Sequence, residues 1–117
     1  MRLDYLIRTP PNHDQVIRPY IIAEAGVNHE GSLEQAKNLI DLAKKGGANA
    51  AKFQNFTSET LICDKAFSKI GNVAHQSAWK ESTFEGYNKV SVPLDWTEDL
   101  KNECKKNNID YFTSPYS

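Results

Sequence analysis

Residues 20–56 read YIIAEAGVNHEGSLEQAKNLIDLAKKGGANAAKFQNF, and this stretch decides the fold. The short segments Tyr20–Glu24 and Ala50–Asn55 each predict a strand. Between them, Ser32 and Gln35 have the spacing of a helix capping box, and the glycine pair at 46–47 is a typical helix stop. The segment between these signals is amphipathic, with apolar residues at Leu33, Ala36, Leu39, Ile40 and Ala43. The order strand, helix, strand predicts a βαβ unit and therefore a parallel sheet.

The end of the sequence repeats this pattern. Trp96, Leu100 and Cys104 recur every four residues and predict a helix from about Leu94 to Lys106. A third strand is predicted from Asp110 to about Thr113, with Pro115 breaking it. The predicted fold class is α/β, with three adjacent parallel strands in chain order. Such a sheet has an open edge and an uncovered face, which favours a piece of a larger protein over a small sandwich completed by self-association.

Two segments lie outside these elements. Residues 1–19 contain Pro10 and Pro11 and predict an extended N-terminal arm or edge element, so the domain proper is expected to span residues 20–117. Residues 57–92 form a long loop, and two interpretations of it stay open, a substrate lid or a small helical excursion that covers the sheet edge. The aromatic residues on which both interpretations depend are Phe67, His75, Trp79, Phe84 and Tyr87.

Composition excludes several classes of function. The 117 residues carry 14 basic and 15 acidic side chains, a net charge of −1. The sequence therefore lacks the excess of positive charge that is typical of proteins that bind nucleic acid or an anionic membrane. The sequence has no apolar run long enough to span a bilayer, and its first 15 residues do not have the pattern expected of a signal peptide. Cys63 and Cys104 have neither metal-ligand nor disulfide-framework spacing, so we expect free thiols and a cytoplasmic protein.

Polar residues gather where the predicted strands end, which is where parallel α/β folds bind ligands. Lys52 and Gln54 are two residues apart on a strand that should be nearly all apolar, so they share one face. A buried ammonium needs an anion, so we expect Lys52 to point toward Gln54 and Glu24, with no protein carboxylate close enough to satisfy it fully. The alternative is a structural ion pair between Glu24 and Lys52. The residues alone predict an anionic small-molecule site and no particular reaction.

Other polar residues at the strand ends have two interpretations each. Asn28 and His29 follow the first strand and either bind substrate or only cap the loop, the second being favoured for His29. Ser114 before Pro115 either binds a ligand or ends the strand in a turn.

The same residues carry a resemblance. The segment from Ile21 to Phe56 resembles the opening of the sialic acid synthase family, whose members begin with an A-E-x-G-x-N-H-x-G loop and a K-x-Q strand. The later CKKNNIDYFTSPYS, residues 104–117, is similar to the third strand of that family, which ends in Ser/Thr-Pro-aromatic. The likeness is close over residues 20–56, good over 93–117 and loose between. The motif EAGVNH, residues 24–29, leans toward sialic or legionaminic acid synthesis rather than the pseudaminic branch.

The resemblance implies a (β/α)8 TIM barrel, of which this chain would supply the first three strands. The implied reaction condenses phosphoenolpyruvate with an N-acetylated amino sugar, N-acetylmannosamine or a related one, to give a sialic-acid-type nonulosonate and phosphate. It implies that Lys52 and Ser114 contact phosphoenolpyruvate, that Gln54 helps to hold the sugar and that Glu24 sits beside its reacting end. It also implies a divalent metal, Mn²⁺ or Mg²⁺, whose ligands lie outside this segment, and a homodimeric full-length protein.

Two other functions compete with this expectation. Another phosphoenolpyruvate aldol synthase is disfavoured by the A-E-x-G-x-N-H loop. A non-catalytic sugar- or phosphate-binding or oligomerisation module is the alternative from a different class. On the leading interpretation, the 117-residue chain by itself is expected to be inactive.

Overall fold

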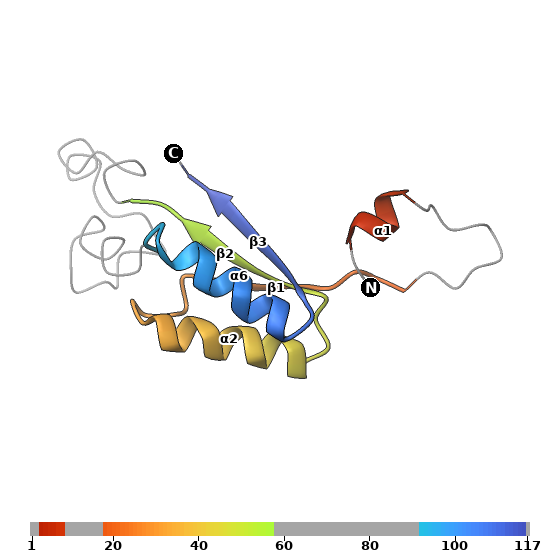
Figure 1. Cartoon of the computed structure of the whole chain (residues 1–117), viewed down its shortest axis with the longest axis horizontal. Coiled ribbons are helices and arrows are strands. Elements are labelled where there is room, and N and C mark those ends of the chain that lie inside the picture. Colours follow the sequence, from red (N-terminus) through yellow and green to blue (C-terminus); the bar gives the residue numbers. More distant parts are fainter. Residues whose placement is uncertain (1–2, 9–17, 58–91, 117) are drawn as a thin grey trace, which may run out of the picture.

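The structure is a computed structural model that describes residues 3–8, 18–57 and 92–116. Three parallel strands, β1 (Ile22–Gly26), β2 (Ala50–Asn55) and β3 (Asp110–Pro115), form one sheet in the order β1-β2-β3. Helix α2 (Leu33–Lys45) joins the first two strands, and α6 (Trp96–Lys106) precedes the third (Figure 1). The predicted adjacent parallel strands, in chain order, are confirmed.

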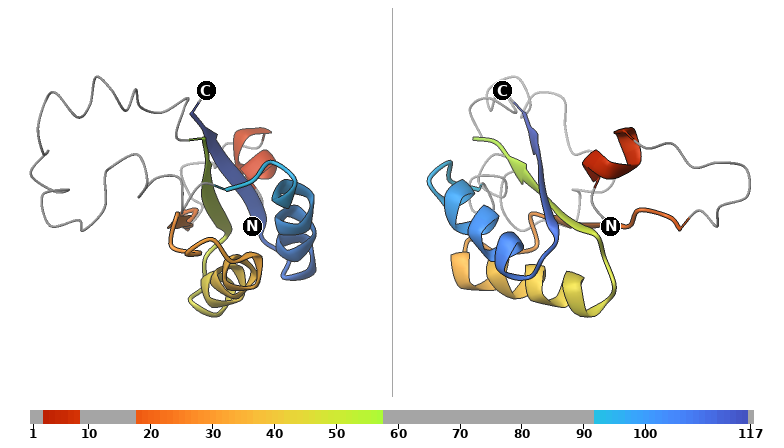
Figure 2. Two further views of the ribbon diagram at one scale, coloured as in Figure 1. Left: turned by 90° about the vertical axis from the view of Figure 1, so that its left-hand side faces the viewer. Right: turned by 45° about the vertical axis from the view of Figure 1, so that its right-hand side comes forward.

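Both long helices pack on the same face of the sheet. The core joins Ala36 and Ile40 of α2, Leu100 of α6, and Ala51 and Phe53 of β2, all of them buried. Figure 2 shows α2 and α6 lying alongside one another next to the strands. Because side chains alternate along a strand, the residues between the core positions of β2 point to the opposite face, which neither helix covers.

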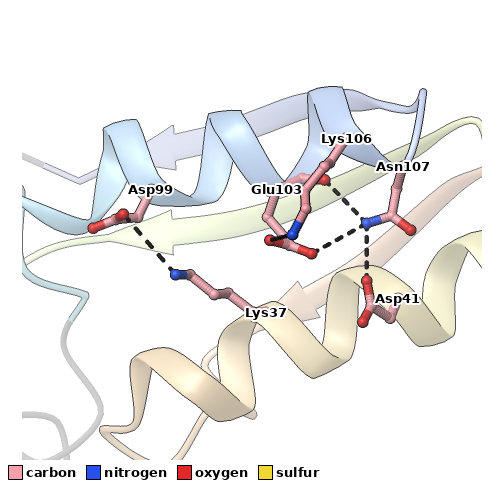
Figure 3. Close-up of polar contacts among 6 residues, drawn as sticks. All are labelled: Lys37, Asp41, Asp99, Glu103, Lys106 and Asn107. Carbon is pink, nitrogen blue, oxygen red and sulfur yellow. Dashed lines mark hydrogen bonds and ion pairs between the residues drawn. The ribbon is translucent and has the colours of Figure 1, made fainter.

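Polar contacts fix how α2 and α6 lie together. Asn107 Nδ2 donates to Asp41 Oδ1 at 2.8 Å, and Lys37 Nζ lies 4.0 Å from Asp99 Oδ1 (Figure 3). The Asn107 amide also donates to the backbone oxygen of Glu103, 3.0 Å away, and so caps the end of its own helix. One side chain therefore closes α6 and links it to α2.

The two helices end in the same way. After α2, Gly47 N donates to Lys44 O and Ala48 N donates to Ala43 O, both at 3.0 Å, which is a Schellman motif. After α6, Asn108 N and Ile109 N make the equivalent bonds. This motif needs a left-handed residue, and Gly47 and Asn108 have φ angles of 86° and 54°. The predicted glycine stop after α2 is thus confirmed, and α6 ends at Lys106, as predicted.

Several boundaries differ from those predicted. β1 begins at Ile22 rather than Tyr20. The backbone groups of Ile21 make hydrogen bonds to Asn49, which lies before the paired residues of β2. β1 continues past Glu24 to Gly26. Helix α6 begins at Trp96 rather than Leu94, since Trp96 N donates to Pro93 O in a turn that leads into it. Ser32 Oγ accepts from Gln35 N, as predicted for the capping box at the start of α2.

β3 continues through Pro115, where we predicted a break. Asp110 N donates to the oxygen of Asn49, the residue just before β2, and Tyr116 N donates to Asn55 O at the end of β2. Backbone N–H groups alternate sides along a strand. The backbone nitrogens of the odd-numbered residues of β3 therefore point away from β2, toward the outer edge of the sheet. A proline there removes no bond to β2, which is why the strand tolerates it.

The N-terminal arm also differs from expectation. Residues Leu3–Arg8 form a short helix, α1, where we predicted an extended segment. The two prolines behind that prediction lie beyond the helix. Leu3 N and Tyr20 Oη both donate to Asp110 Oδ2, so the arm is fastened at the end of the sheet where β3 begins. The loop aromatics and Cys63 fall outside the described residues.

Cys104 is a core residue. It is a free thiol, 1% exposed, and its pKa is raised from 9.0 to about 12 by burial, with the neighbouring carboxylates of Glu103 and Asp110 adding to the effect. Burial likewise raises the pKa of Tyr111, which stacks on Phe53. A thiol held protonated in this way is a poor nucleophile, so Cys104 belongs to the packing and not to the chemistry.

The glycine pair after α2 gives a direct test of this backbone account. Gly47→Ala should lower the free energy of unfolding by about 1 kcal/mol, because an L side chain is strained at its φ of 86° although a Cβ would meet nothing within 4 Å. Gly46→Ala is the matched control, since Gly46 has a helical φ of −75° and should change stability by less than about 0.5 kcal/mol. Urea unfolding measures both, and equal losses in the two variants would contradict the assignment.

Candidate active site

Lys52 and Gln54 of β2 lie on the face opposite α2 and α6. Ala51, Phe53 and Asn55 are buried, whereas Lys52 and Gln54 are only partly buried. The sheet therefore separates an apolar layer under the helices from a polar surface on its other side. The shared face that the sequence predicted for Lys52 and Gln54 is present.

The strand register brings three further polar side chains to this face. Glu24 of β1 lies opposite Lys52, and Ser114 of β3 lies opposite Gln54. Four of the six predicted site residues thus meet on three neighbouring strands, toward their carboxyl ends. At the other end of the same face, Asp110 lies opposite Ala50.

One expectation about Lys52 is wrong. Its Nζ lies 3.0 Å from Glu24 Oε2, so a protein carboxylate does pair with it. The cause is the register, which places the two residues directly opposite one another on neighbouring strands. The pair is not deeply buried, since 35% of the lysine side chain and 48% of the glutamate side chain are exposed. Pairs with this much exposure contribute about 0–1 kcal/mol to stability and exchange partners readily.

A bulge at the end of β1 shapes the surroundings of Glu24. The register shifts between Glu24 and Gly26, so Ala25 has no partner on β2. Gly26 has a φ of 55°, and a Cβ added there would lie 3.5 Å from Glu24 Oε1 and 4.0 Å from Asn28 Nδ2. Glycine is thus favoured at this position by its backbone angle, whereas a Cβ there would make only ordinary van der Waals contacts with the two site side chains.

Asn28 and His29 occupy the turn after β1 in different ways. Asn28 is exposed, and its backbone N and side-chain Nδ2 both donate to Ala25 O. His29 is fully buried, its Nδ1 accepts from Gly31 N at 3.0 Å, and its ring meets Trp96 edge-on with centroids 5.3 Å apart. These contacts favour the structural interpretation of His29, as a side chain that holds the turn against α6.

Sequence reasoning did not single out Asn55. Its side chain is 5% exposed, accepts a hydrogen bond from Thr113 Oγ1 and donates to Val92 O at 3.5 Å. The alternation of side chains along β2 could have identified Asn55 from the sequence. Asn55 follows Ala51 and Phe53 at the two-residue spacing, so it is polar at a helix-facing position and needs internal partners.

A hollow of about 470 Å³ lies elsewhere, between α6 and the beginning of β3. Cys104, Ile109 and Tyr111 are among the residues that line it, and none of the predicted site residues does. Among the residues that the structure describes, no three His, Cys, Asp or Glu side chains come together to hold a metal ion. No helix in this part of the chain is long and apolar enough to cross a membrane.

Comparison with known proteins gives these residues a context. A profile of the NeuB family matches residues 39–117. The N,N'-diacetyllegionaminic acid synthase of Campylobacter jejuni is 38% identical over 96 residues, which cover 82% of this chain and 28% of that protein. The pseudaminic acid synthase of the same species is 33% identical over 99 residues, covering 84% of this chain and 28% of the relative.

A solved structure agrees with these relatives. The N-acetylneuraminic acid synthetase of Leptospira borgpetersenii, in complex with citrate, matches with a TM-score of 0.63 and 30% identity over 84% of this chain and 29% of that chain. This chain therefore spans just over a quarter of the length of these relatives. Since the family profile matches more than half of its residues, the chain belongs to the NeuB family, the family of the sialic, legionaminic and pseudaminic acid synthases, as its motifs predicted.

Proposed function

We propose that this chain supplies part of the active site of a synthase that condenses phosphoenolpyruvate with an N-acetylated amino sugar. N-acetylmannosamine or a related sugar is the acceptor, one water is consumed as the phosphate leaves, and the products are a sialic-acid-type nonulosonate and phosphate. The observation that carries this proposal is the group of Glu24, Lys52, Gln54 and Ser114 on one face of the sheet, in a chain of the NeuB family.

The three strands are proposed to open a (β/α)8 barrel. In such a barrel the helices cover the outside and the other face of every strand lines the interior. The polar face of β2 and the apolar core under α2 and α6 fit this division. The carboxyl ends of the strands would then form the mouth of the barrel, where the enzymes of this fold place their active sites.

Lys52 and Ser114 are assigned to phosphoenolpyruvate. This substrate carries a phosphate and a carboxylate, and an ammonium attracts either one as a point charge. A serine hydroxyl can donate to the same oxygens. One relative, the Leptospira synthetase, forms a complex with citrate, which is itself a small polyanion.

Gln54 and Glu24 are assigned to the amino sugar. An amide both donates and accepts, which suits the orientation of sugar hydroxyls. A carboxylate beside the aldehyde carbon can hold or move the proton of the oxygen that becomes a hydroxyl when the carbon–carbon bond forms. Asn28, next to Gly26 and exposed, is retained as a substrate contact, and His29 as the side chain that supports its turn.

The ion pair adds a step that the sequence did not predict. With Glu24 Oε2 at 3.0 Å from Lys52 Nζ, an incoming phosphate or carboxylate must join or displace the glutamate. The half-exposed pair is weak enough for this exchange. Displacement would free the Glu24 carboxylate to turn toward the sugar, so binding of one substrate would prepare the site for the other.

A divalent metal, Mn²⁺ or Mg²⁺, is proposed on the family resemblance alone. The described residues do not bring three suitable ligands together, and the ligands are proposed to lie outside this segment. The homodimer and the cytoplasmic location likewise stay predictions. That the product is a sialic or legionaminic acid rather than a pseudaminic acid also stays a prediction, because both legionaminic and pseudaminic acid synthases are among the relatives.

Lys52→Met tests the assignment of the lysine, in the whole protein that carries this chain. Methionine keeps the bulk of the stem and removes the ammonium, so phosphoenolpyruvate binding should weaken roughly 10- to 150-fold, the equivalent of about 1.5–3 kcal/mol. The melting temperature should change little, because the pair with Glu24 is half exposed. Calorimetric titration with phosphoenolpyruvate and a thermal melt measure the two quantities.

The matched control is Lys101→Met. Lys101 is also ion-paired, with Glu98 at 3.5 Å, but it lies on α6 away from the site and should leave the affinity unchanged. If Lys52→Met unfolds the protein while the phosphoenolpyruvate affinity stays the same, Lys52 is a structural ion-pair partner and the assignment fails.

Glu24→Gln should have the opposite effect on binding. Removing the carboxylate releases the Lys52 ammonium and removes repulsion toward the substrate anion, so phosphoenolpyruvate should bind about 2- to 5-fold more tightly. Turnover should fall about 100-fold or more, because the amide cannot take or give the proton. Dissociation constants and kcat measured together decide the case, with Glu98→Gln as the control. Weaker binding with unchanged turnover would show that Glu24 serves only to orient Lys52.

A further inference from the structure

Asn55 lies directly behind the proposed site. It follows Gln54 in β2 but points to the helix side of the sheet, where it is 5% exposed. Among the described residues, Asn55 and His29 are the buried polar side chains. A polar side chain at this buried position needs hydrogen-bond partners. The partners of Asn55 come from two other segments of the chain, β3 and the residues that lead into α6.

Three hydrogen bonds converge on this residue. Its Oδ1 accepts from Thr113 Oγ1, its Nδ2 donates to Val92 O at 3.5 Å, and its backbone oxygen accepts from Tyr116 N at 3.0 Å. Thr113 and Tyr116 flank the Ser114-Pro115 pair, so Asn55 contacts β3 on both sides of Ser114. Val92 belongs to the segment that leads into α6 and is itself buried.

We infer that Asn55 is a positioning residue, which holds the carboxyl ends of β2 and β3 so that Gln54 and Ser114 face one another at the spacing the substrates require. This inference rests on the proposed function for the roles of those two residues. Gln54 and Ser114 are partners in the strand register, but they lie near the carboxyl ends of β2 and β3. The ends of strands separate more easily than their centres. Asn55 would oppose that separation without touching the substrates.

The side-chain chemistry explains why asparagine fits. Its amide accepts from the Thr113 hydroxyl and donates to the Val92 carbonyl at the same time. An aspartate has the same shape but can only accept when ionised, so it would bring a buried charge and lose the donor. Alanine would leave the carbonyl and the hydroxyl without this partner.

The test uses Asn55→Ala, Thr113→Val and the double variant in the whole protein, each assayed well below its melting temperature. For Asn55→Ala, we expect KM for phosphoenolpyruvate or for the amino sugar to rise about 5- to 20-fold, with kcat within about 3-fold of wild type. The double variant should lie within about 2-fold of Asn55→Ala, because both changes break the same bond. The amides of Ser114 and Tyr116 should exchange their hydrogens about 10-fold faster.

Asn107→Ala is the matched control. Asn107 also joins separate elements, through Asp41 and the Glu103 backbone (Figure 3), so its loss should lower the melting temperature and leave KM unchanged. If Asn55→Ala does not fold, Thr113→Val, which removes the hydroxyl that bonds Asn55 and keeps the side-chain shape, decides with the same readouts. Lower stability with unchanged KM, or unchanged exchange at Ser114 and Tyr116, would overturn the inference.

The two proposals fail in different ways. A wild-type protein that does not bind phosphoenolpyruvate would overturn the proposed function. In that case the exchange rates of Ser114 and Tyr116 alone decide whether Asn55 holds the strand ends.

Discussion

The alternation of side chains along β2 is the constraint on which the rest of this structure depends. Ala51, Phe53 and Asn55 face α2 and α6, and their burial fixes the orientation of the strand. A shift by one residue would put Lys52 and Gln54 into the apolar layer under the helices and leave Phe53 uncovered. Burial of one phenylalanine is worth about 1.5–3 kcal/mol, and an unpaired ammonium in its place would cost several kcal/mol more. The packing of the core therefore decides where the polar residues lie.

The register then determines what the polar residues meet. Glu24 lies opposite Lys52, and Ser114 opposite Gln54, because parallel pairing sets all the partners once the strands are in place. The ion pair at 3.0 Å is a consequence of this register. In a polar, partly exposed setting it is weak enough to exchange, so one arrangement serves both the folded resting protein and the proposed binding of a substrate anion.

Local signals in the sequence predicted much of this fold. The helix stop at Gly47 and the cap at Ser32 depend on neighbouring residues, so a single sequence reveals them. The shared face of Lys52 and Gln54 follows from spacing alone. The contacts that the sequence did not predict depend on residues far apart in the chain, such as Tyr20 with Asp110 and Asn55 with Thr113. The sequence predicted a Glu24–Lys52 ion pair only as an alternative interpretation, because the register that makes the pair direct is set by the sheet and not by either segment.

The central claim is that Lys52, on the face turned away from the helices, receives the anion of the substrate. It is tested most directly by a crystal structure of the whole protein soaked with phosphoenolpyruvate. The account predicts a phosphate or carboxylate oxygen about 2.7–2.9 Å from Lys52 Nζ, contact with the Ser114 hydroxyl, and Glu24 turned away from the lysine. Phosphoenolpyruvate bound elsewhere, with the Glu24–Lys52 pair still at 3.0 Å, would contradict it.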